Sequence, residues 1–271
     1  MLGLRLLTAA VLVPLALAGL FMLSNALWAL ASGVFVLIGA WEWSRLAGGR
    51  GMVRIAYTVV VAVAGVAVYS LSAAPSDSSV GVASVILAAA VAFWILAAVP
   101  WLVATWHVRS PVLLHVVGAV VLIPAWLGGI LLQREPVRFL VLMAVVWVAD
   151  SGAYFVGRKF GRRKLAPRIS PGKSWEGVAG AAVAVLLYYF VVNRIRPGAL
   201  PGDGLAGLLF LELMLALSIV GDLFESWMKR EAGVKDSGTL LPGHGGVLDR
   251  IDSLTSTLPA AALMVSMSTL T

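Results

Sequence analysis

The sequence predicts an all-α integral membrane protein with about nine transmembrane helices and a cytoplasmic N-terminus. Two observations on composition point to this fold class: 61% of the 271 residues are hydrophobic, and only 12% are charged. Soluble domains are about 45–50% apolar and about 25% charged, so this chain has too few polar residues to cover a soluble fold. The third observation is the distribution of the basic residues, which favours one orientation of the spans.

Nine apolar stretches come close to the roughly 20 residues that cross a hydrocarbon core. The first follows Arg5 and has features of a signal peptide, but its apolar run exceeds the usual 7–15 or so residues, so we expect a retained span. The seventh and ninth stretches are the weakest. The expected spans are 6–23, 26–43, 55–74, 80–106, 111–132, 139–155, 178–192, 205–223 and 254–270.

The basic residues are consistent with this arrangement. With the N-terminus inside, 16 of the 20 Lys and Arg residues fall on cytoplasmic segments, as the positive-inside rule predicts. Orientation and anionic lipid headgroups therefore explain the net charge of +7, and we expect membrane lipids rather than nucleic acid as partners. The same orientation places two polar loops, 157–177 and 224–252, in the cytoplasm.

We divide the chain into an N-terminal transmembrane scaffold, 1–135, with about five spans, and a C-terminal catalytic transmembrane region, 136–271. The scaffold offers few groups for chemistry, because Glu42 lies between tryptophans typical of a membrane interface and because His107 and His115 belong to no motif. The sequence has no cysteine, which excludes disulfides, thiolate zinc sites and cysteine nucleophiles.

Asp150 is the first candidate in the C-terminal region. An ionisable residue inside a span costs about 2.5–3.5 kcal/mol on insertion scales and is a functional candidate by default. Tyr154 shares its helix face. An ion pair with a nearby basic residue is the structural alternative for Asp150, and topology or lipid attraction explains most of the seven basic residues that follow, between 158 and 173.

The stretch 170–177, SPGKSWEG, predicts a turn that opens the seventh span. Ser174 is suited to cap the helix, and Glu176 lies in its first turn. Free backbone amides at a helix start, with Lys173 beside them, predict an anion site.

The most polar part of the chain is 226–253, a charged, glycine-rich stretch between two apolar runs. If the eighth helix continues beyond the membrane surface, Asp222, Ser226 and Lys229 lie on one face. Asp222 and Asp249 converge if the loop folds back, and two carboxylates with substrate phosphates are a common way to hold magnesium. Basic side chains can neutralise the remaining phosphate charge: Lys229, Arg230, Lys235 and Arg250. No common nucleotide-binding signature is present, so the residues alone predict a site for a metal-bound polyphosphate and leave the base and the reaction open.

Three motifs add a resemblance to a known family. The pattern S-x-x-K-R-x-x-x-x-K-D-x-G-x-x-x-P-G-H-G-G-x-x-D-R-x-D, from Ser226 to Asp252, closely resembles the signature of phosphatidate cytidylyltransferases. SPGKSWEG is similar to a second motif of that family, and D-x-x-A-Y-x-x-G-R-x-x-G, from Asp150 to Gly161, to a third. The resemblance in motifs covers about 147–253, while the first half matches mainly in hydropathy and length.

The resemblance implies an integral membrane enzyme of phospholipid biosynthesis that makes CDP-diacylglycerol and pyrophosphate from CTP and phosphatidic acid. It also implies that Asp222 and Asp249 hold a divalent metal, expected to be Mg2+, with a second cation such as K+ nearby. The implied catalytic groups are Lys229, Lys235, His244 and Arg250. The implied substrate-binding residues are Ser170, Lys173, Glu176, Ser226, Arg230, Asp236, Asp252, Asp150 and Tyr154.

Two other functions remain open at this stage. A CTP-dependent lipid-alcohol kinase would use similar groups but transfer the γ-phosphate, and a polytopic transporter would line its pathway with Asp150 and Asp222. The chain shows no internal repeat, and its acids gather at the cytoplasmic ends of the spans. We expect the cell inner (plasma) membrane as the location, with the active site facing the cytoplasm, and a homodimer is compatible with the sequence.

Overall fold

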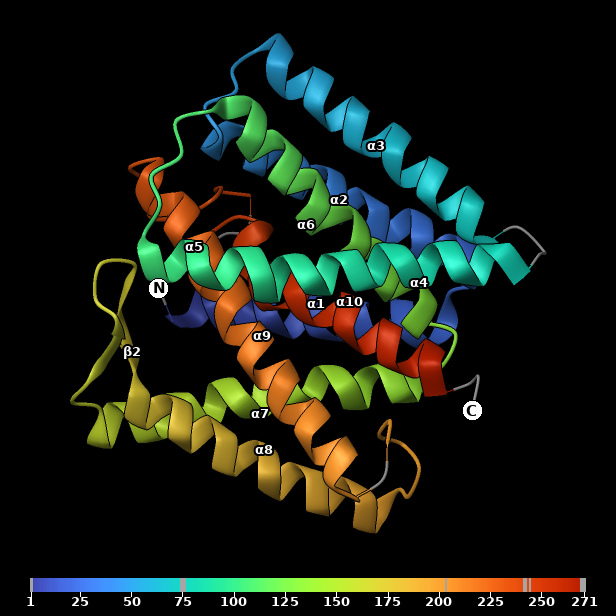
Figure 1. Cartoon of the computed structure of the whole chain (residues 1–271), viewed down its shortest axis with the longest axis vertical. Coiled ribbons are helices and arrows are strands. Elements are labelled where there is room, and N and C mark those ends of the chain that lie inside the picture. The colour runs from blue at the N-terminus through green and yellow to red at the C-terminus, as the bar shows by residue number, and fades with distance from the viewer. Residues whose placement is uncertain (1, 74–76, 203, 241–242, 244, 269–271) are drawn as a thin grey trace.

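The computed structural model describes residues 2–73, 77–202, 204–240, 243 and 245–268, and most of them are helical (Figure 1). The N-terminal elements are α1 (Leu2–Met22), α2 (Asn25–Leu46), α3 (Met52–Ala73), α4 (Asp77–Ala92), the π-helix η1 (Phe93–Ala98), α5 (Val99–Ala104) and α6 (Pro111–Leu132). The C-terminal elements are α7 (Pro136–Phe160), β1 (Lys164–Ala166), β2 (Ser170–Ser174), α8 (Trp175–Ile195), α9 (Gly204–Glu231) and α10 (Leu248–Ser268).

Seven helices in the described part of the chain are long and apolar enough to cross a membrane. Six of them are α2, α3, α6, α7, α8 and α9, and the seventh is the continuous run formed by α4, η1 and α5. α1 supplies only a shorter apolar segment, Ala10–Met22. The predicted helical membrane class is therefore confirmed. The number of spans, the side of the N-terminus and the division at residue 135 stay predictions.

The middle of the molecule is formed by α6 and α10, which pack against each other. α2 and α4 contact this pair, and α9 packs on α10 and reaches α8. Figure 1 shows α2 and α3 at one end of the molecule and the pair α7–α8 at the other, with α9 running between. Residues from both halves of the sequence thus share the core.

A cluster of aromatic side chains fixes the end of α9 that carries the predicted site. Phe224 lies edge to face with Trp94 and with Trp101, each at a ring-centroid distance of 5.6 Å, and stacks on Trp43 at 6.4 Å. Trp94 belongs to η1, which comes just before Pro100, a residue without an N–H for the regular helical ladder. The cluster anchors α9 to α2, η1 and α5.

α7 and α8 approach each other through glycines. A Cβ placed on Gly180 would lie 2.5 Å from Cβ of Val156, and one placed on Gly152 would lie 2.8 Å from Cβ of Ala184. Small residues that allow such close contact are the usual basis of helix association in membranes. This contact positions α7 beside the helix that begins with the predicted SPGKSWEG motif.

Three local features differ from the sequence-based expectation. The region 157–177 is not a simple loop: α7 continues to Phe160, and β1 pairs antiparallel with β2 in a short hairpin. The helical prediction missed this hairpin because its strands are only three and five residues long. Likewise, α9 continues to Glu231, well beyond the predicted end of its span. His107 and His115, which belong to no sequence motif, each have a partner in the structure: Glu231 lies 2.9 Å from His107, and Ser44 lies 2.9 Å from His115.

Glu42 joins α2 to the start of α10, although the two lie some 200 residues apart in sequence. Its carboxylate is 5% exposed and accepts hydrogen bonds from the N–H groups of Val247 at 3.0 Å and Leu248 at 2.9 Å. It also accepts one from the hydroxyl of Ser237 at 2.9 Å. A carboxylate near the first amides of a helix satisfies donors that have no partner within the helix.

The loop before α10 closes tightly around this carboxylate. A Cβ on Gly246 would lie 2.2 Å from Oγ of Ser237 and 2.5 Å from Oε2 of Glu42, and a Cβ on Gly238 would lie 2.2 Å from Oε1 of Glu42. Only glycine fits at these two positions. Arg45, one turn after Glu42, donates to the carbonyl oxygens of Asp236 at 3.1 Å and Ser237 at 2.5 Å. The cytoplasm-facing end predicted for α2 therefore holds the polar loop in place.

Substituting Gly180→Ala tests the contact between α7 and α8. The added methyl group overlaps Val156, so we expect a loss of about 1–3 kcal/mol in stability and a lower Tm of the detergent-solubilised protein. Gly81→Ala is the matched control, because a Cβ at Gly81 meets nothing within 4 Å. Equal Tm values for the two variants would contradict the tight packing.

Substituting Glu42→Gln tests the contact between α2 and α10. The amide group replaces an acceptor with a donor, so at least one buried donor loses its partner, at a cost of about 1–3 kcal/mol. We expect the amides of Val247 and Leu248 to exchange hydrogen at least about tenfold faster. Glu212→Gln is the control, since the Glu212 carboxylate has no hydrogen bond among the described residues. Unchanged exchange in the Glu42 variant would show that the carboxylate does not hold the loop.

Candidate active site

The predicted polar face of α9 is present, because the helix extends past Phe224 as one uninterrupted element. Asp222, Ser226 and Lys229 lie along this face. The hydroxyl of Ser226 donates to Oδ1 of Asp222 at 3.3 Å, and the ammonium of Lys229 forms an ion pair with Glu225. The face combines acidic and basic groups at the end of an apolar helix.

Asp222 is the centre of the first group of charges. Its Oδ2 lies 2.5 Å from the ammonium of Lys173, which comes from β2, and the two side chains are 29% and 26% exposed. Asp150 of α7 and Asp252 of α10 are both within electrostatic range of Asp222 and of Lys173. Three acids from three helices thus surround one lysine from the hairpin.

Asp249 is the centre of the second group and is almost fully buried, with 5% of its side chain exposed. Oδ1 accepts a hydrogen bond from Lys229 at 2.6 Å. Oδ2 accepts from the N–H of Gly246 at 2.8 Å, and from the N–H of Ser237 at 2.9 Å and its hydroxyl at 3.0 Å. The loop does fold back onto α9, as the prediction of converging acids requires.

The pKa of Asp249, which precedes the predicted last span, reflects this environment. Burial raises the pKa, but the hydrogen bonds from Lys229 and from the backbone of Gly246 and Ser237 lower it by more, so the net pKa lies below its ordinary value. Asp249 is therefore ionised at neutral pH. Asp252 also lies within range of Lys229, which links the two groups of charges.

The hairpin residues have a structural part in the site. Ser174 caps α8, as predicted, by accepting from the N–H of Gly177 at 3.2 Å. Glu176 accepts from the N–H groups of Arg162 at 3.0 Å and Arg163 at 3.1 Å. The N–H of Trp175 donates to the carbonyl of Arg163. The amides of Trp175 and Gly177, both expected to be free for an anion, therefore already have acceptors. Of the groups predicted to bind an anion at this helix start, mainly the ammonium of Lys173 remains.

Several predicted residues lie near these groups without joining them. Ser170 begins β2 and pairs with Ala166, and Arg230 donates to the carbonyl of Ile169 at 3.3 Å, which ties α9 to the hairpin. The hydroxyl of Tyr154 contacts Arg158 at 3.0 Å rather than an acid. The side chains of Lys235, Asp236 and Arg250 are exposed, and His244 lies outside the described residues.

The two predicted metal ligands differ in how they could accept a cation. No set of three or more Asp, Glu or His side chains in the described part of the chain is grouped closely enough to hold a metal ion. However, Asp222 through Oδ2 and Asp249 through Oδ1 each face a lysine ammonium, which stands where a cation would bind. Asp222 is the more accessible, whereas Oδ2 of Asp249 is already taken by the loop. Each carboxylate offers oxygen atoms of the kind that a divalent ion such as magnesium prefers, at the point where a lysine ammonium now lies.

Glu42 and Arg45 contribute to the site and were not singled out from the sequence. Both lie in the half of the chain expected to be scaffold, yet they bind the loop that carries Asp249. A signal was available for Glu42, because it is an acid inside a predicted span, the same feature that marked Asp150.

Comparison with known proteins gives a consistent answer along the whole chain. The model of the cytidylyltransferase family matches residues 3–268. A phosphatidate cytidylyltransferase of Pseudomonas aeruginosa is 47% identical over 274 residues, covering 98% of this chain and 97% of the relative. A phosphatidate cytidylyltransferase of Haemophilus influenzae is 39% identical over 282 residues, with 96% of each chain covered. One of Thermotoga maritima is 44% identical over 128 residues, which is 46% of this chain and 47% of the relative.

The matches extend through the N-terminal half, where the sequence offered only hydropathy and length, and through the C-terminal half that carries the two groups of charges. The chain therefore belongs to the cytidylyltransferase family.

Proposed function

We propose that this protein transfers the cytidylyl group of CTP to phosphatidic acid, giving CDP-diacylglycerol and pyrophosphate for phospholipid biosynthesis. The observation that carries the proposal is the similarity over nearly the whole chain to phosphatidate cytidylyltransferases. The meeting of the three motifs beside α9 supports it, since Asp150, Lys173 and Asp249 come from different motifs and lie in two linked groups of charges.

The reaction depends more on charge neutralisation than on a general base. An oxygen of the phosphatidate phosphate attacks the α-phosphorus of CTP, a new P–O bond forms, and the bond from the α-phosphorus to the bridging oxygen of the leaving pyrophosphate breaks. The nucleophile is already anionic, so the main barriers are the repulsion between anions and the charge that develops on the leaving group.

Lys173 and Lys229 are suited to neutralising phosphate charge because side-chain carboxylates hold them in position. Lys173 and Lys229 pair with acids and are partly or largely shielded from water, so their charges act in a medium of lower polarizability than water. Lys235, in the loop before α10, and Arg250, in the first turn of α10, are exposed and supply further donors to the phosphates. Ser226, Arg230, Asp236 and Asp252 support these groups, and His244 is proposed as a phosphate contact.

A divalent cation, which we propose to be magnesium, would when bound reduce the repulsion between the phosphates and stabilise the leaving group. Asp222 and Asp249 would hold it, with a second cation such as potassium close by. Lys173 would then no longer pair with Asp222, nor Lys229 with Asp249, and both ammonium groups could bind phosphate oxygens.

The proposed orientation follows from the distribution of basic residues. The N-terminus, the hairpin and the loop before α10 face the cytoplasm, where CTP is found, and the protein resides in the cell inner (plasma) membrane. A lipid-alcohol kinase or a transporter is not favoured, because the full-length relatives are cytidylyltransferases.

Labelled CTP tests the function directly. Purified protein receives phosphatidic acid, magnesium and CTP labelled on either the α- or the γ-phosphate. We expect the α label in the lipid and the γ label in released pyrophosphate. A γ label in the lipid would show a kinase, and transfer of neither label by folded protein would contradict both enzymes.

Substituting Asp222→Asn tests the metal assignment. We expect turnover to fall by about 100-fold or more, because the amide keeps the shape of the side chain but loses the charge that attracts the cation. Added magnesium should restore part of the activity. Asp222 is preferable to Asp249 for this test, because Asp249 also holds the loop.

Glu135→Gln is the control for this variant, since it removes an exposed carboxylate at the start of α7, where it pairs with Arg138. Near-normal activity of Asp222→Asn, with magnesium as the sole divalent ion, would rule out Asp222 as a metal ligand.

A further inference from the structure

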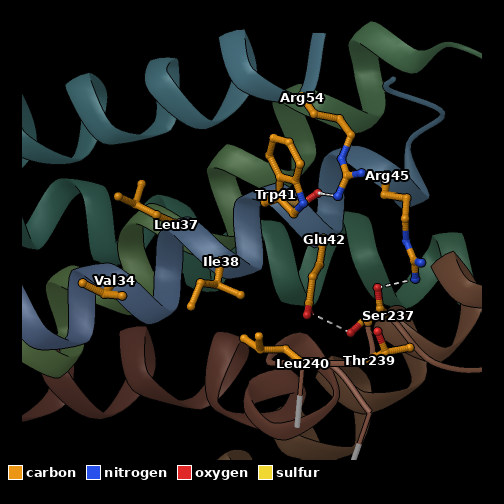
Figure 2. Close-up of a pocket in the computed structure, with 11 residues that line it drawn as sticks. Val34, Leu37, Ile38, Trp41, Glu42, Arg45, Arg54, Ser237, Thr239 and Leu240 are labelled. Carbon is orange, nitrogen blue, oxygen red and sulfur yellow. Dashed lines mark hydrogen bonds between the residues drawn. The ribbon is translucent and has the colours of Figure 1, made fainter. Parts of the chain in front are cut away.

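A pocket of about 580 Å³ lies between α2, the start of α3 and the loop before α10. Val34, Leu37 and Ile38 line one end of it, whereas Arg45 and Arg54 line the other (Figure 2). Trp41, Glu42 and the loop residues Ser237, Gly238, Thr239 and Leu240 complete the wall. The pocket is thus apolar along the helix and basic at its end.

The dimensions of this pocket suit a lipid. Val34 and Arg45 are separated along α2 by roughly 16 Å at the rise of an α-helix, which is about half of the 30 Å or so of a hydrocarbon core. Val34 is 56% exposed and Leu240 is 56% exposed. The apolar end therefore lies at the depth of acyl chains when the basic end lies at the membrane surface.

The two arginines lack an acidic partner. None of the ion pairs found in the described residues includes Arg45 or Arg54. Arg45 donates to carbonyl oxygens of the loop, and Nε of Arg54 is buried without a hydrogen-bond partner. The guanidinium groups act electrostatically on each other, so two like charges share one end of the pocket.

The acid that lines the same pocket, Glu42, acts electrostatically on Arg54 but forms no ion pair with either arginine among the described residues. Both carboxylate oxygens of Glu42 already accept hydrogen bonds, Oε1 from Val247 and Oε2 from Leu248 and Ser237. Arg54 is held in place by Trp41, since its guanidinium lies 3.9 Å from the ring centroid and donates to the carbonyl of Trp41 at 3.3 Å. The two guanidinium groups therefore keep N–H donors available for an anion at this end of the pocket.

We propose that this pocket binds the lipid substrate, with the phosphate of phosphatidic acid at Arg45 and Arg54 and an acyl chain along Val34, Leu37 and Ile38. A phosphomonoester carries a charge of about −1.5 to −2 at neutral pH and has three terminal acceptor oxygens, and arginine binds such oxygens through paired hydrogen bonds. A phosphodiester headgroup has a single charge and one terminal oxygen fewer, so it accepts fewer hydrogen bonds from the two guanidinium groups. This inference rests on the proposed function.

The pocket also adjoins the charged groups of the candidate active site. Ser237 lines the pocket and donates two hydrogen bonds to Oδ2 of Asp249, at 2.9 and 3.0 Å. Ser237 therefore lies between the proposed headgroup site and Asp249, the proposed metal ligand. The acceptor phosphate would reach the nucleotide from the bilayer side of the loop.

Substituting Arg54→Gln tests the pocket with the least disturbance of the loop, because Arg54 has no hydrogen bond to it among the described residues. In mixed micelles we expect the KM for phosphatidic acid to rise about tenfold, the value of one charge-assisted hydrogen bond, and the KM for CTP to stay constant. Arg54→Lys should recover part of the loss. Arg50→Gln is the matched control, since it removes the same charge four residues earlier, between α2 and α3, and Arg50 does not line the pocket.

A binding experiment separates this site from the reaction. Native mass spectrometry without CTP counts bound phosphatidic acid and phosphatidylglycerol on the wild type, Arg54→Gln, Arg50→Gln and Ile38→Trp, the last of which fills the apolar end. We expect Arg54→Gln and Ile38→Trp to lose phosphatidic acid selectively. Equal binding by Arg54→Gln and Arg50→Gln, or an equal loss of both lipids, would overturn the proposal.

The two proposals fail in different ways. If the α label of CTP enters the lipid and Arg54→Gln has a normal KM for phosphatidic acid, the pocket assignment is wrong and the proposed function stands. If the wild type binds phosphatidic acid in an Arg54-dependent manner but transfers no label, the proposed function is wrong and the anionic-lipid pocket stands.

Discussion

The buried carboxylate of Glu42 is the contact on which the geometry of the polar loop depends. Three donors converge on it, two of them the N–H groups of Val247 and Leu248 next to the start of α10. In the buried interior no water can take the place of this carboxylate as the acceptor for these donors. A carboxylate at this point therefore specifies where α10 begins. The position of Asp249, one residue further on, follows from that constraint. Asp249 in turn fixes Lys229 on α9.

The second property of the site is that its opposite charges are paired between side chains. Lys173 and Lys229 pair with Asp222, Asp249 and Glu225 through side chains alone, and such pairs can be exchanged for phosphates and a cation without breaking a helix. Removing one member without a replacement would leave a shielded charge without a partner, which is costly. The ion pairs are therefore consistent with the proposed role of these side chains in binding substrate.

Local patterns in the sequence were enough for the helices, the polar face of α9 and the cap at Ser174, because these depend on residues three or four positions apart. The hairpin at 164–174 was missed because its short strands alternate poorly and contain Pro171 and Gly172. Glu42 and Arg45 were missed for a different reason: their partners lie more than 190 residues away. Long-range contacts of this kind leave only an indirect trace in one sequence, here an acid within an apolar helix.

The loop before α10 is bound on two sides by carboxylates, and this arrangement suits a reaction between a soluble and a membrane-bound substrate. Ser237 donates its hydroxyl towards both Glu42, on the side of the α2 pocket, and Asp249, on the side of the ion pairs with α9. A hydroxyl has one proton, so it can donate fully to one carboxylate at a time. Under the proposed function, a lipid phosphate on one side or a cation with its nucleotide on the other would change which carboxylate receives that proton. Ser237 would in this way link the two faces of the loop without a large movement of the helices.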